Sequence, residues 1–380
     1  MNYDVIVVGA GPAGSFCAYT LARAGLSVAL LEKAKLPRSK VCGGALSRKT
    51  LDLAGCDLSS VIHHRVDRAT LTYRNETSAV VRLDDAAACM TIRAEFDAFL
   101  ADRARAAGAQ VLDGTAFEQA ARTDDGVNVT TSRGVLQARF LVGADGVGSR
   151  VRKSVFGQAG IRQVPSVEAL LRVPQSTLDH FRDHALFDLG GMDHGYGWIF
   201  PKRDHLNVGV YSARPAKKLH DQLNRFLARH PVLAEHEVLS RVGYAIPLFD
   251  PNRPVARGRT LLVGDAAGFA EGVYGEGIYF AMRSGQLAAQ AIADHRPDEA
   301  LAAYTSAVGR YLAPELRFSN WIGRAFFAFP RFAFHHLAMH PTGQRKFAGV
   351  ITGEVSYREC FWGTLRALPR WAFRRSRAPA

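Results

Sequence analysis

Three glycines near the N-terminus, and one acidic residue after them, have the spacing of a dinucleotide-binding turn. Gly9, Gly11 and Gly14 follow an apolar run that begins at Tyr3, in the pattern G-x-G-x-x-G. In such a turn the glycines permit the tight bend, the approach of a pyrophosphate and the close packing of the next helix. Glu32 ends the next apolar run, where an acid can accept hydrogen bonds from a ribose. The turn alone fits NAD and FAD equally well.

Two further stretches could contact a ligand. Cys42 precedes Gly43 and Gly44, whose bare backbone suits a flat ligand, although an ordinary loop explains the two glycines equally well. Arg93 stands at the start of a helical pattern, where the helix dipole does not favour a cation. Its position indicates either a bound anion nearby or a solvated surface arginine.

Buried strands are needed to bring these residues together. Apolar runs of strand length end in a turn with an acid at Glu32, Asp145 and Asp265. The glycine-rich stretch 272–277 follows the last of these runs, and we expect a helix over 278–295 after it. Ser149 is a predicted N-cap, and a further helix is expected from residue 93 to 108.

The middle of the chain has a different, strand-rich character. We expect a hairpin over 66–83 that turns at Asn75. Between 165 and 248 the patterns predict strands at 167–173, 186–189, 195–200 and 206–211, with helices at 216–229 and 231–240. The rings of Tyr196, Trp198 and Phe200 alternate along one strand and so share a face. Aromatic residues at this period are ordinarily typical of a buried sheet face.

The C-terminal part is predicted to be helical from Asp298, a candidate N-cap, to about residue 336. Aromatic and arginine residues are frequent there, among them Trp362, Trp371, Phe373, Arg366, Arg370, Arg374, Arg375 and Arg377. Core helices with a solvated basic tail and a surface-lying membrane helix explain this composition equally well. His336 and His340 have the spacing of metal ligands, but no third ligand is in view, and we expect no metal.

Composition excludes several classes of protein. The chain has 380 residues, a net charge of +13 and five cysteines without metal-ligand spacing. Only 9 of the 48 basic residues are lysine, the basic residues are scattered, and no nucleic-acid motif is present. We therefore expect no nucleic-acid partner. The cysteines predict a reducing compartment, and no signal peptide is recognisable, so we expect a cytoplasmic protein.

The order and spacing of the glycine turn, Asp145 and Asp265 resemble those of FAD-dependent oxidoreductases of the aromatic-hydroxylase class. Within this class the chain is most similar to the geranylgeranyl reductase family. The resemblance is carried by Lys40-Val41-Cys42-Gly43-Gly44, Arg93 with Phe96-Asp97, Gly195-Tyr196-Gly197-Trp198-Ile199-Phe200-Pro201 and Gly275-Glu276-Gly277-Ile278. The family's cavity pattern is P-x-x-Y-x-W-x-F-P, and Asp193 stands here in place of its first proline.

This resemblance implies an α/β fold with a discontinuous Rossmann-like FAD-binding domain, a sheet-rich α+β substrate domain and a helical C-terminal segment. We expect these parts at residues 1–62, 88–156 and 245–296, at 63–87 and 157–244, and at 297–380, respectively. The resemblance implies FAD contacts from Gly9, Gly11, Ala13, Gly14, Glu32, Lys33, Cys42, Gly43, Arg93, Asp145, Asp265, Gly277 and Ile278. It also implies a substrate wall of Tyr196, Trp198 and Phe200, with Cys42 or an ordered water as the proton donor.

The implied reaction is saturation of isoprenoid double bonds by hydride transfer from reduced FAD. A monooxygenase or halogenase acting on an aromatic or apolar substrate is the alternative, although Gly268 replaces the usual hydroxylase histidine and the halogenase pattern W-x-W-x-I-P is absent. No second nucleotide-binding turn is visible, so we expect either NAD(P)H or a ferredoxin-like carrier to reduce the flavin. The expected substrate is an isoprenoid or lipid, and the aromatic, arginine-rich C-terminus could contact the inner face of the membrane.

Overall fold

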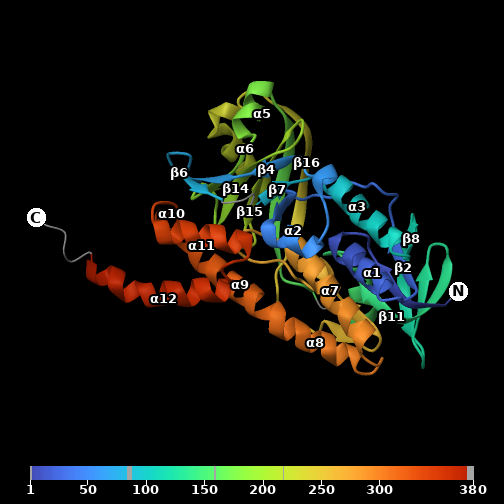
Figure 1. The fold of residues 1–380 in the computed structure, drawn as a ribbon. Helices are drawn as coiled ribbons and strands as arrows, with labels where there is room; N and C mark the ends of the chain where they lie inside the picture. The colour runs from blue at the N-terminus through green and yellow to red at the C-terminus, as the bar shows by residue number, and fades with distance from the viewer. Residues whose placement is uncertain (1, 84–87, 158–159, 217, 375–380) are drawn as a thin grey trace, which may run out of the picture.

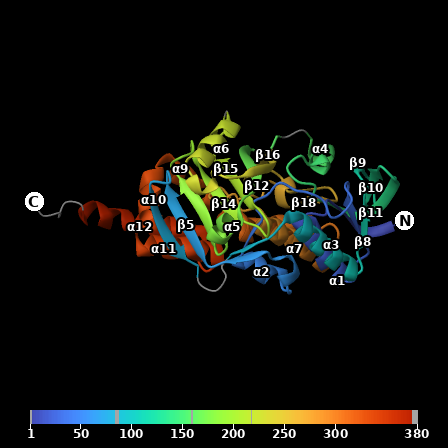
Figure 2. The same cartoon turned by 90° about the horizontal axis from the view of Figure 1, so that it is seen from above.

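The protein folds into an elongated molecule in which two large sheets lie end to end, and the C-terminal helices run alongside both (Figures 1 and 2). The computed structural model describes residues 2–83, 88–157, 160–216 and 218–374; at residues 2, 365 and 367–374 it describes the backbone alone. The predicted features at Arg370, Trp371, Phe373, Arg374, Arg375 and Arg377 therefore lie outside the described side chains or residues. The mixed architecture confirms the predicted α/β class.

The first sheet is mainly parallel and includes strands from distant parts of the chain. Its central order is β17-β18-β11-β1-β2-β8, and β10 and β9 extend β11 as an antiparallel ribbon. These strands are β1 (Asn2–Val8), β2 (Val28–Glu32), β8 (Gln110–Asp113), β9 (Phe117–Arg122), β10 (Val127–Thr131), β11 (Gly134–Gly143), β17 (Ala256–Arg257) and β18 (Thr260–Leu262). The parallel pairing of β18 with β11 brings the ends of the apolar runs to one edge of this sheet. The predicted domain boundaries stay a prediction.

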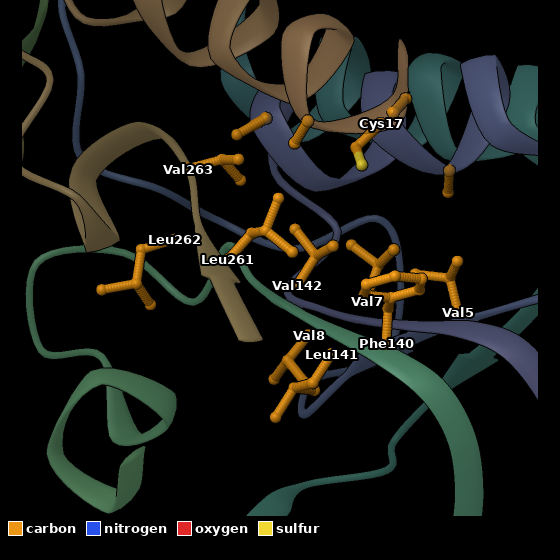
Figure 3. Packing of buried hydrophobic residues seen from close by; sticks show 14 of the residues in the cluster. Val5, Val7, Val8, Cys17, Phe140, Leu141, Val142, Leu261, Leu262 and Val263 are labelled. Carbon is orange, nitrogen blue, oxygen red and sulfur yellow. The ribbon is translucent and has the colours of Figure 1, made fainter. Parts of the chain in front are cut away.

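Helices cover the centre of this sheet because its central strands are apolar. All five residues of β2 are buried, which is typical of a parallel strand covered on both faces. The helices are α1 (Pro12–Arg23), α3 (Arg93–Ala106), α4 (Arg150–Phe156) and α7 (Ile278–Asp294). Figure 3 shows Cys17 of α1 close to side chains of β1, β11 and β18 in this core. The helices α1 and α7 approach closely, since a Cβ on Gly285 would lie 2.3 Å from the carbonyl oxygen of Ala13.

The second sheet has the order β16-β12-β15-β14-β13-β5-β6. Its strands are β5 (Arg68–Tyr73), β6 (Thr77–Arg82), β12 (Gln163–Arg172), β13 (His184–Leu189), β14 (Gly195–Pro201), β15 (Leu206–Ser212) and β16 (Glu237–Pro247). The helices α5 (Gln175–Phe181) and α6 (Leu219–Ala228) pack beside it, and η2 (Pro231–Leu233) follows α6. The predicted hairpin at Asn75 is confirmed.

The predicted helix at 231–240 is wrong. Only one short turn forms there, and Glu237 begins strand β16, which pairs with β12 over ten residue pairs. Antiparallel pairing with a long neighbour, interrupted by one irregularity at Leu170/Leu171, outweighs the weak local helical pattern.

A small third sheet connects the other two. It consists of β3 (Ala45–Ser47), β4 (His64–Val66) and β7 (Ala88–Met90) in the order β3-β7-β4, with α2 (Arg48–Ala54) and η1 (Ser59–Val61) beside it. Because β3 directly follows Cys42, Gly43 and Gly44, this sheet holds one end of that loop.

The C-terminal helices pack against the second sheet on one side and α7 on the other (Figures 1 and 2). They are α8 (Ala300–Tyr311), α9 (Ala313–Ala328), α10 (Pro330–Ala338), α11 (Pro341–Thr352) and α12 (Tyr357–Arg374). The predicted cap at Asp298 is wrong, because α8 begins later and Glu299 is its N-cap. Ser149, in contrast, does cap α4 by accepting a hydrogen bond from the N–H of Arg152. Within the described chain, no helix has the length and apolar character needed to cross a bilayer.

Candidate functional site

One cavity of about 630 Å³ lies where the three sheets meet. A volume of this size is typical of pockets that enclose small organic ligands. Every residue that the sequence assigned to a cofactor or substrate lines it except Gly14. Gly14 instead lies behind the turn, where a Cβ would be 1.9 Å from the carbonyl oxygen of Gly9.

The glycine turn forms one end of this cavity. Gly9 has a φ of +105°, and a Cβ there would meet the carbonyl oxygen of Ala144 at 2.4 Å, so the position requires glycine. Gly11 faces open space, because a Cβ there would have only the Nη2 atoms of Arg38 and Arg93 within 4 Å, at 3.8 and 3.9 Å. It is also the N-cap of α1, whose first turn contains no acid and whose N–H groups have no side-chain cap. Free N–H groups beside two guanidinium groups suit an anion such as a pyrophosphate.

Arg38 is a site residue that the sequence reasoning missed. Its Nε lies 3.0 Å from Oε2 of Glu32, and its Nη1 donates to Oδ2 of Asp97 at 2.9 Å. Arg93 forms a bidentate pair with the same Asp97, at 2.8 and 2.9 Å. Burial lowers the pKa of Arg93, but the Asp97 carboxylate more than offsets this and holds the pKa above its usual range. Arg93 is therefore not a solvated surface arginine.

Glu32 is held at the end of β2. Its Oε2 accepts the N–H of Ala10 and its Oε1 accepts that of Ala34, both at 3.1 Å. Lys33, next along the chain, is exposed at the rim of the cavity. This arrangement places a buried carboxylate one strand away from the glycine turn.

The two aspartates at the other strand ends have different partners. Asp145 accepts hydrogen bonds from Ser149 Oγ at 2.5 Å and from the N–H groups of Arg150 and Val151 at 2.6 and 3.1 Å. It therefore supports the start of α4, and burial raises its pKa. Asp265 accepts the hydroxyl of Tyr244 at 3.1 Å.

Asp265 also lies close to the beginning of α7. Its Oδ1 would be 3.7 Å from a Cβ on Gly277, which is the N-cap of that helix. The first turn of α7, from Ile278, contains no acid, and no side chain caps it. A second set of free helical N–H groups thus lies at the cavity, which Gly277 and Ile278 line.

The loop of Cys42, Gly43 and Gly44 is fixed by side chains from the second sheet. Lys202 donates from Nζ to the carbonyl oxygens of Gly43 and Gly44, at 2.7 and 3.2 Å. Oε1 of Glu168 accepts the N–H of Cys42 at 3.3 Å. Burial lowers the pKa of Lys202 to about 8 and raises the pKa of Glu168.

Neither Glu168 nor Lys202 was predicted from the sequence. Glu168 did give a signal, since it interrupts the apolar strand β12 with a carboxylate. Its Oε2 accepts Nδ2 of Asn207 at 3.2 Å, and Asn207 Oδ1 in turn accepts Nε1 of Trp198 at 2.8 Å. These bonds connect the cysteine loop with the aromatic strand.

Tyr196, Trp198 and Phe200 form an aromatic wall along one face of β14. Their rings lie 6.0 to 6.2 Å apart in sequence order, and all three line the cavity. The wall is also part of a buried cluster that includes Phe187 of β13 and Phe327 of α9. It therefore serves as a core face on one part of its surface and as a cavity wall on another.

Asp193, where the family pattern has proline, lies outside this wall. Its side chain is exposed in the turn before β14, and it does not line the cavity. Its carbonyl oxygen accepts the hydroxyl of Ser212 at 3.0 Å. The side chain at the departing position therefore forms no part of the cavity surface.

Comparison with known proteins agrees with this geometry. Residues 2–309 match the family described as FAD binding domain. The geranylgeranyl diphosphate reductase of Rhodobacter capsulatus is 32% identical over 306 residues, which cover 77% of this chain and 75% of that protein. The chain belongs to the geranylgeranyl reductase family. This confirms the predicted FAD-dependent oxidoreductase and the predicted cofactor FAD.

Solved structures support the fold of this geranylgeranyl reductase family member. A geranylgeranyl bacteriochlorophyll reductase-like protein from Thermoplasma acidophilum has a TM-score of 0.77 at 23% identity, over 97% of this chain and 96% of that one. A flavin-dependent brominase also has a TM-score of 0.77, at 20% identity, over 97% of this chain and 100% of its own. Fold similarity therefore does not separate a reductase from a halogenase.

The residues present fit FAD. A pyrophosphate fits at Gly11 with Arg38 and Arg93, a ribose fits beside Glu32, and the first turn of α7 provides N–H groups for the far end of the cofactor. In the described chain, no cluster of three or more His, Cys, Asp or Glu side chains could hold a metal.

Proposed function

We propose that this enzyme saturates carbon–carbon double bonds of an isoprenoid chain. The observation that carries the proposal is the aromatic wall of Tyr196, Trp198 and Phe200, which continues the cofactor cavity with an apolar surface. A wall of rings buries an apolar chain without offering it polar partners. The relative from Rhodobacter capsulatus is named a geranylgeranyl diphosphate reductase, and this agrees with such a substrate.

The chain's own residues bind and orient the reactants in this proposal. Gly9, Gly11, Arg38 and Arg93 hold the pyrophosphate, and Glu32 holds the adenosine ribose. Ala13, Lys33, Gly43, Asp145, Asp265, Gly277 and Ile278 surround the rest of the cofactor. Reduced FAD, when bound, supplies the hydride. The N–H groups of α7 stabilise negative charge at their end of the cavity, and the aromatic wall excludes water from the alkene.

Cys42 is the proposed proton donor. Reduction adds a hydride to one alkene carbon and a proton to its neighbour, so the site needs an acidic group beside the apolar wall. Cys42 lines the cavity between the phosphate end and Phe200, whose ring would lie 3.0 Å from a Cβ on Gly43. The thiol gives its proton to the carbon and regains one from water.

Mass spectrometry tests the reaction directly. Reduced holoenzyme incubated anaerobically with geranylgeranyl lipids should yield products that have gained two hydrogens per double bond. Cys42→Ser keeps a side chain of similar size but replaces the thiol with a much weaker acid, so it should retain FAD while it slows the reaction. If no prenyl lipid gains hydrogen under these conditions, the proposed function is wrong.

The alternative is a monooxygenase or halogenase acting on an apolar or aromatic substrate, and similarity to the brominase fold keeps this alternative worth testing. It requires molecular oxygen, whereas prenyl reduction does not. Turnover that stops when oxygen is removed, with an oxygenated or halogenated product, would support the alternative.

Reduction of the flavin and delivery of the substrate involve partners. We propose NAD(P)H or a ferredoxin-like carrier as the reductant, to be distinguished by adding each to the oxidised holoenzyme and following flavin bleaching. We also propose that the cytoplasmic enzyme touches the inner face of the membrane through its C-terminal helices. Exposed large apolar side chains there are Tyr311, Trp321, Phe329, Phe332, Met339 and Trp362.

Charge on the same helices agrees with a lipid surface. Arg317, Arg324 and Arg366 are exposed there, beside exposed Trp321 and Trp362. Co-flotation with vesicles containing anionic lipid should be lost in the double variant Trp321→Ser/Trp362→Ser while prenyl reduction in detergent is retained. Equal flotation of the variant and the unaltered protein would contradict the membrane contact.

A further inference from the structure

The loop from Glu271 to Gly277 connects the first sheet to α7 and forms part of the cavity. Tyr274, Gly275, Glu276 and Gly277 all line the cavity. Because Gly277 is the N-cap of α7, the path of this loop decides where the free N–H groups of that helix point. The contacts that fix this loop therefore help to determine the geometry of the cofactor site.

Glu271 is the side chain at the centre of this loop. It is fully buried, with 0% exposure. Its oxygens accept the N–H groups of Val273 at 2.7 Å, Tyr274 at 2.6 Å and Glu276 at 2.9 Å. A fourth donor, the hydroxyl of Tyr357, lies 2.9 Å from Oε2. A carboxylate with this many donors fixes the backbone that supplies them.

The fourth donor comes from a distant part of the chain. Tyr357 begins α12, and its own N–H donates to Oε2 of Glu315 in α9 at 2.9 Å. Helix α9 also contacts the loop directly, since a Cβ on Gly323 would lie 2.2 Å from the carbonyl oxygen of Gly272. The C-terminal helices therefore contact the loop at two points, Glu271 and Gly272.

The cavity side of the loop contacts the aromatic wall. The hydroxyl of Tyr196 donates to the carbonyl oxygen of Tyr274 at 2.5 Å, and that of Tyr211 donates to the carbonyl oxygen of Gly272 at 3.3 Å. Tyr274 thus donates its N–H to Glu271 and accepts a hydrogen bond from the substrate wall. A continuous series of bonds joins α12 to the cavity.

We propose that Glu271 is a positioning residue for the FAD site, and that Tyr357 of α12 completes it. The carboxylate sets the backbone of residues 272–276, and this backbone places both the start of α7 and the carbonyl oxygen that receives Tyr196. The C-terminal segment then helps to position the cofactor site through Tyr357. This inference requires FAD binding but no particular substrate, so it stands or fails separately from prenyl reduction.

Glu271→Gln tests the proposal in the FAD-loaded protein. The amide keeps the volume of the side chain but turns one acceptor into a donor that faces N–H groups, so at least one loop N–H loses its partner. We expect FAD binding to weaken about tenfold, the visible circular dichroism of bound FAD to change, and amide exchange of residues 273, 274 and 276 to accelerate. Glu354→Gln makes the same change at an exposed carboxylate in the turn between α11 and α12, and it is the matched control.

Tyr357→Phe gives a second and milder test, and it stands alone if Glu271→Gln does not fold. It removes one donor and keeps the ring, so the same three signals should shift in the same direction by a smaller factor. In the double variant, Tyr357→Phe should cause little further change in these three signals beyond that caused by Glu271→Gln. The proposal is overturned if every variant that folds, Tyr357→Phe alone included, keeps the dichroism of bound FAD and an FAD affinity within about twofold of the unaltered protein, whether or not amide exchange changes.

Discussion

The two ends of the cavity are built in different ways. At the phosphate end, backbone geometry dominates: Gly9 and Gly14 are required because any side chain would collide with main-chain oxygens. At the substrate end, side chains from distant segments dominate, since Glu168 reaches Cys42 across 126 residues and Lys202 reaches Gly43 across 159. The glycine spacing marks the first kind of structure in the local sequence, even though the oxygen that restricts Gly9 belongs to Ala144 at the end of β11. The second kind leaves no such local pattern.

The largest effect is expected from Gly14→Ala, at the backbone end. The new Cβ would lie 1.9 Å from the carbonyl oxygen of Gly9, so α1 and its preceding turn must separate. We expect a loss of stability of about 3 kcal/mol and near-complete loss of bound FAD, measured by urea unfolding and flavin absorbance. Gly309→Ala makes the same chemical change in α8, where the new Cβ would have no atom within 4 Å beyond the backbone of its own helix, and it should leave FAD binding unchanged and stability unchanged or slightly raised. Full FAD occupancy in Gly14→Ala would contradict the backbone argument.

The difference between the two ends also explains what could be predicted. The glycine turn, Glu32 and the strand-end aspartates could be predicted because their spacing along the chain fixes their geometry. Arg38 could not, since nothing in the polar stretch 33–40 marks which cation turns toward Asp97. The prediction of a helix at 231–240 was wrong for the same reason, because the local sequence does not show that this segment pairs with β12. Glu168 was the exception, a carboxylate in an apolar strand that could have been noticed.

Lys202→Met should have the next largest effect, at the substrate end. It leaves the carbonyl oxygens of Gly43 and Gly44 without their donor, so we expect a loss of about 2 kcal/mol at neutral pH, partly offset because a buried cation is removed. Weakened FAD binding should be milder than in Gly14→Ala. The control Lys35→Met removes an exposed lysine instead.

The pH dependence of the same variant gives a sharper test. Burial lowers the pKa of Lys202 from 10.5 to about 8, so between these values the unfolded chain binds more protons than the folded one. Stability contributed by Lys202 therefore rises with pH through this window, and the full penalty of burying a cation applies below about pH 8. The difference in unfolding free energy between the unaltered protein and Lys202→Met should grow from about pH 7.5 to about pH 9.5. A difference in unfolding free energy that does not change with pH would show that the pKa of Lys202 is not lowered in the folded protein.

Trp198→Phe should have a smaller effect, and it should affect the substrate end of the cavity without affecting the phosphate end. It removes the hydrogen bond from Nε1 to Asn207 and part of the aromatic wall, but it lies away from the glycine turn. We expect the KM for a prenyl substrate to rise about fivefold while FAD affinity stays the same. Steady-state kinetics alongside FAD titration measures both quantities. Parallel loss of FAD affinity would mean that the ends are not independent.

The smallest effect is expected at Asp193, although it is the position that departs from the family pattern. If the pattern were read as a list of cavity residues, Asp193→Ala would alter substrate choice. The structure instead places this side chain in solvent, in a turn whose hydrogen bond to Ser212 uses the backbone carbonyl. Surface substitutions of this kind change stability by no more than about 0.5 kcal/mol. The ratio of kcat/KM for geranylgeranyl and farnesyl substrates should therefore stay within about twofold of the unaltered enzyme. A larger change would mean that the turn before β14 shapes the cavity through the backbone, and that the substrate end, like the phosphate end, is partly encoded in local sequence.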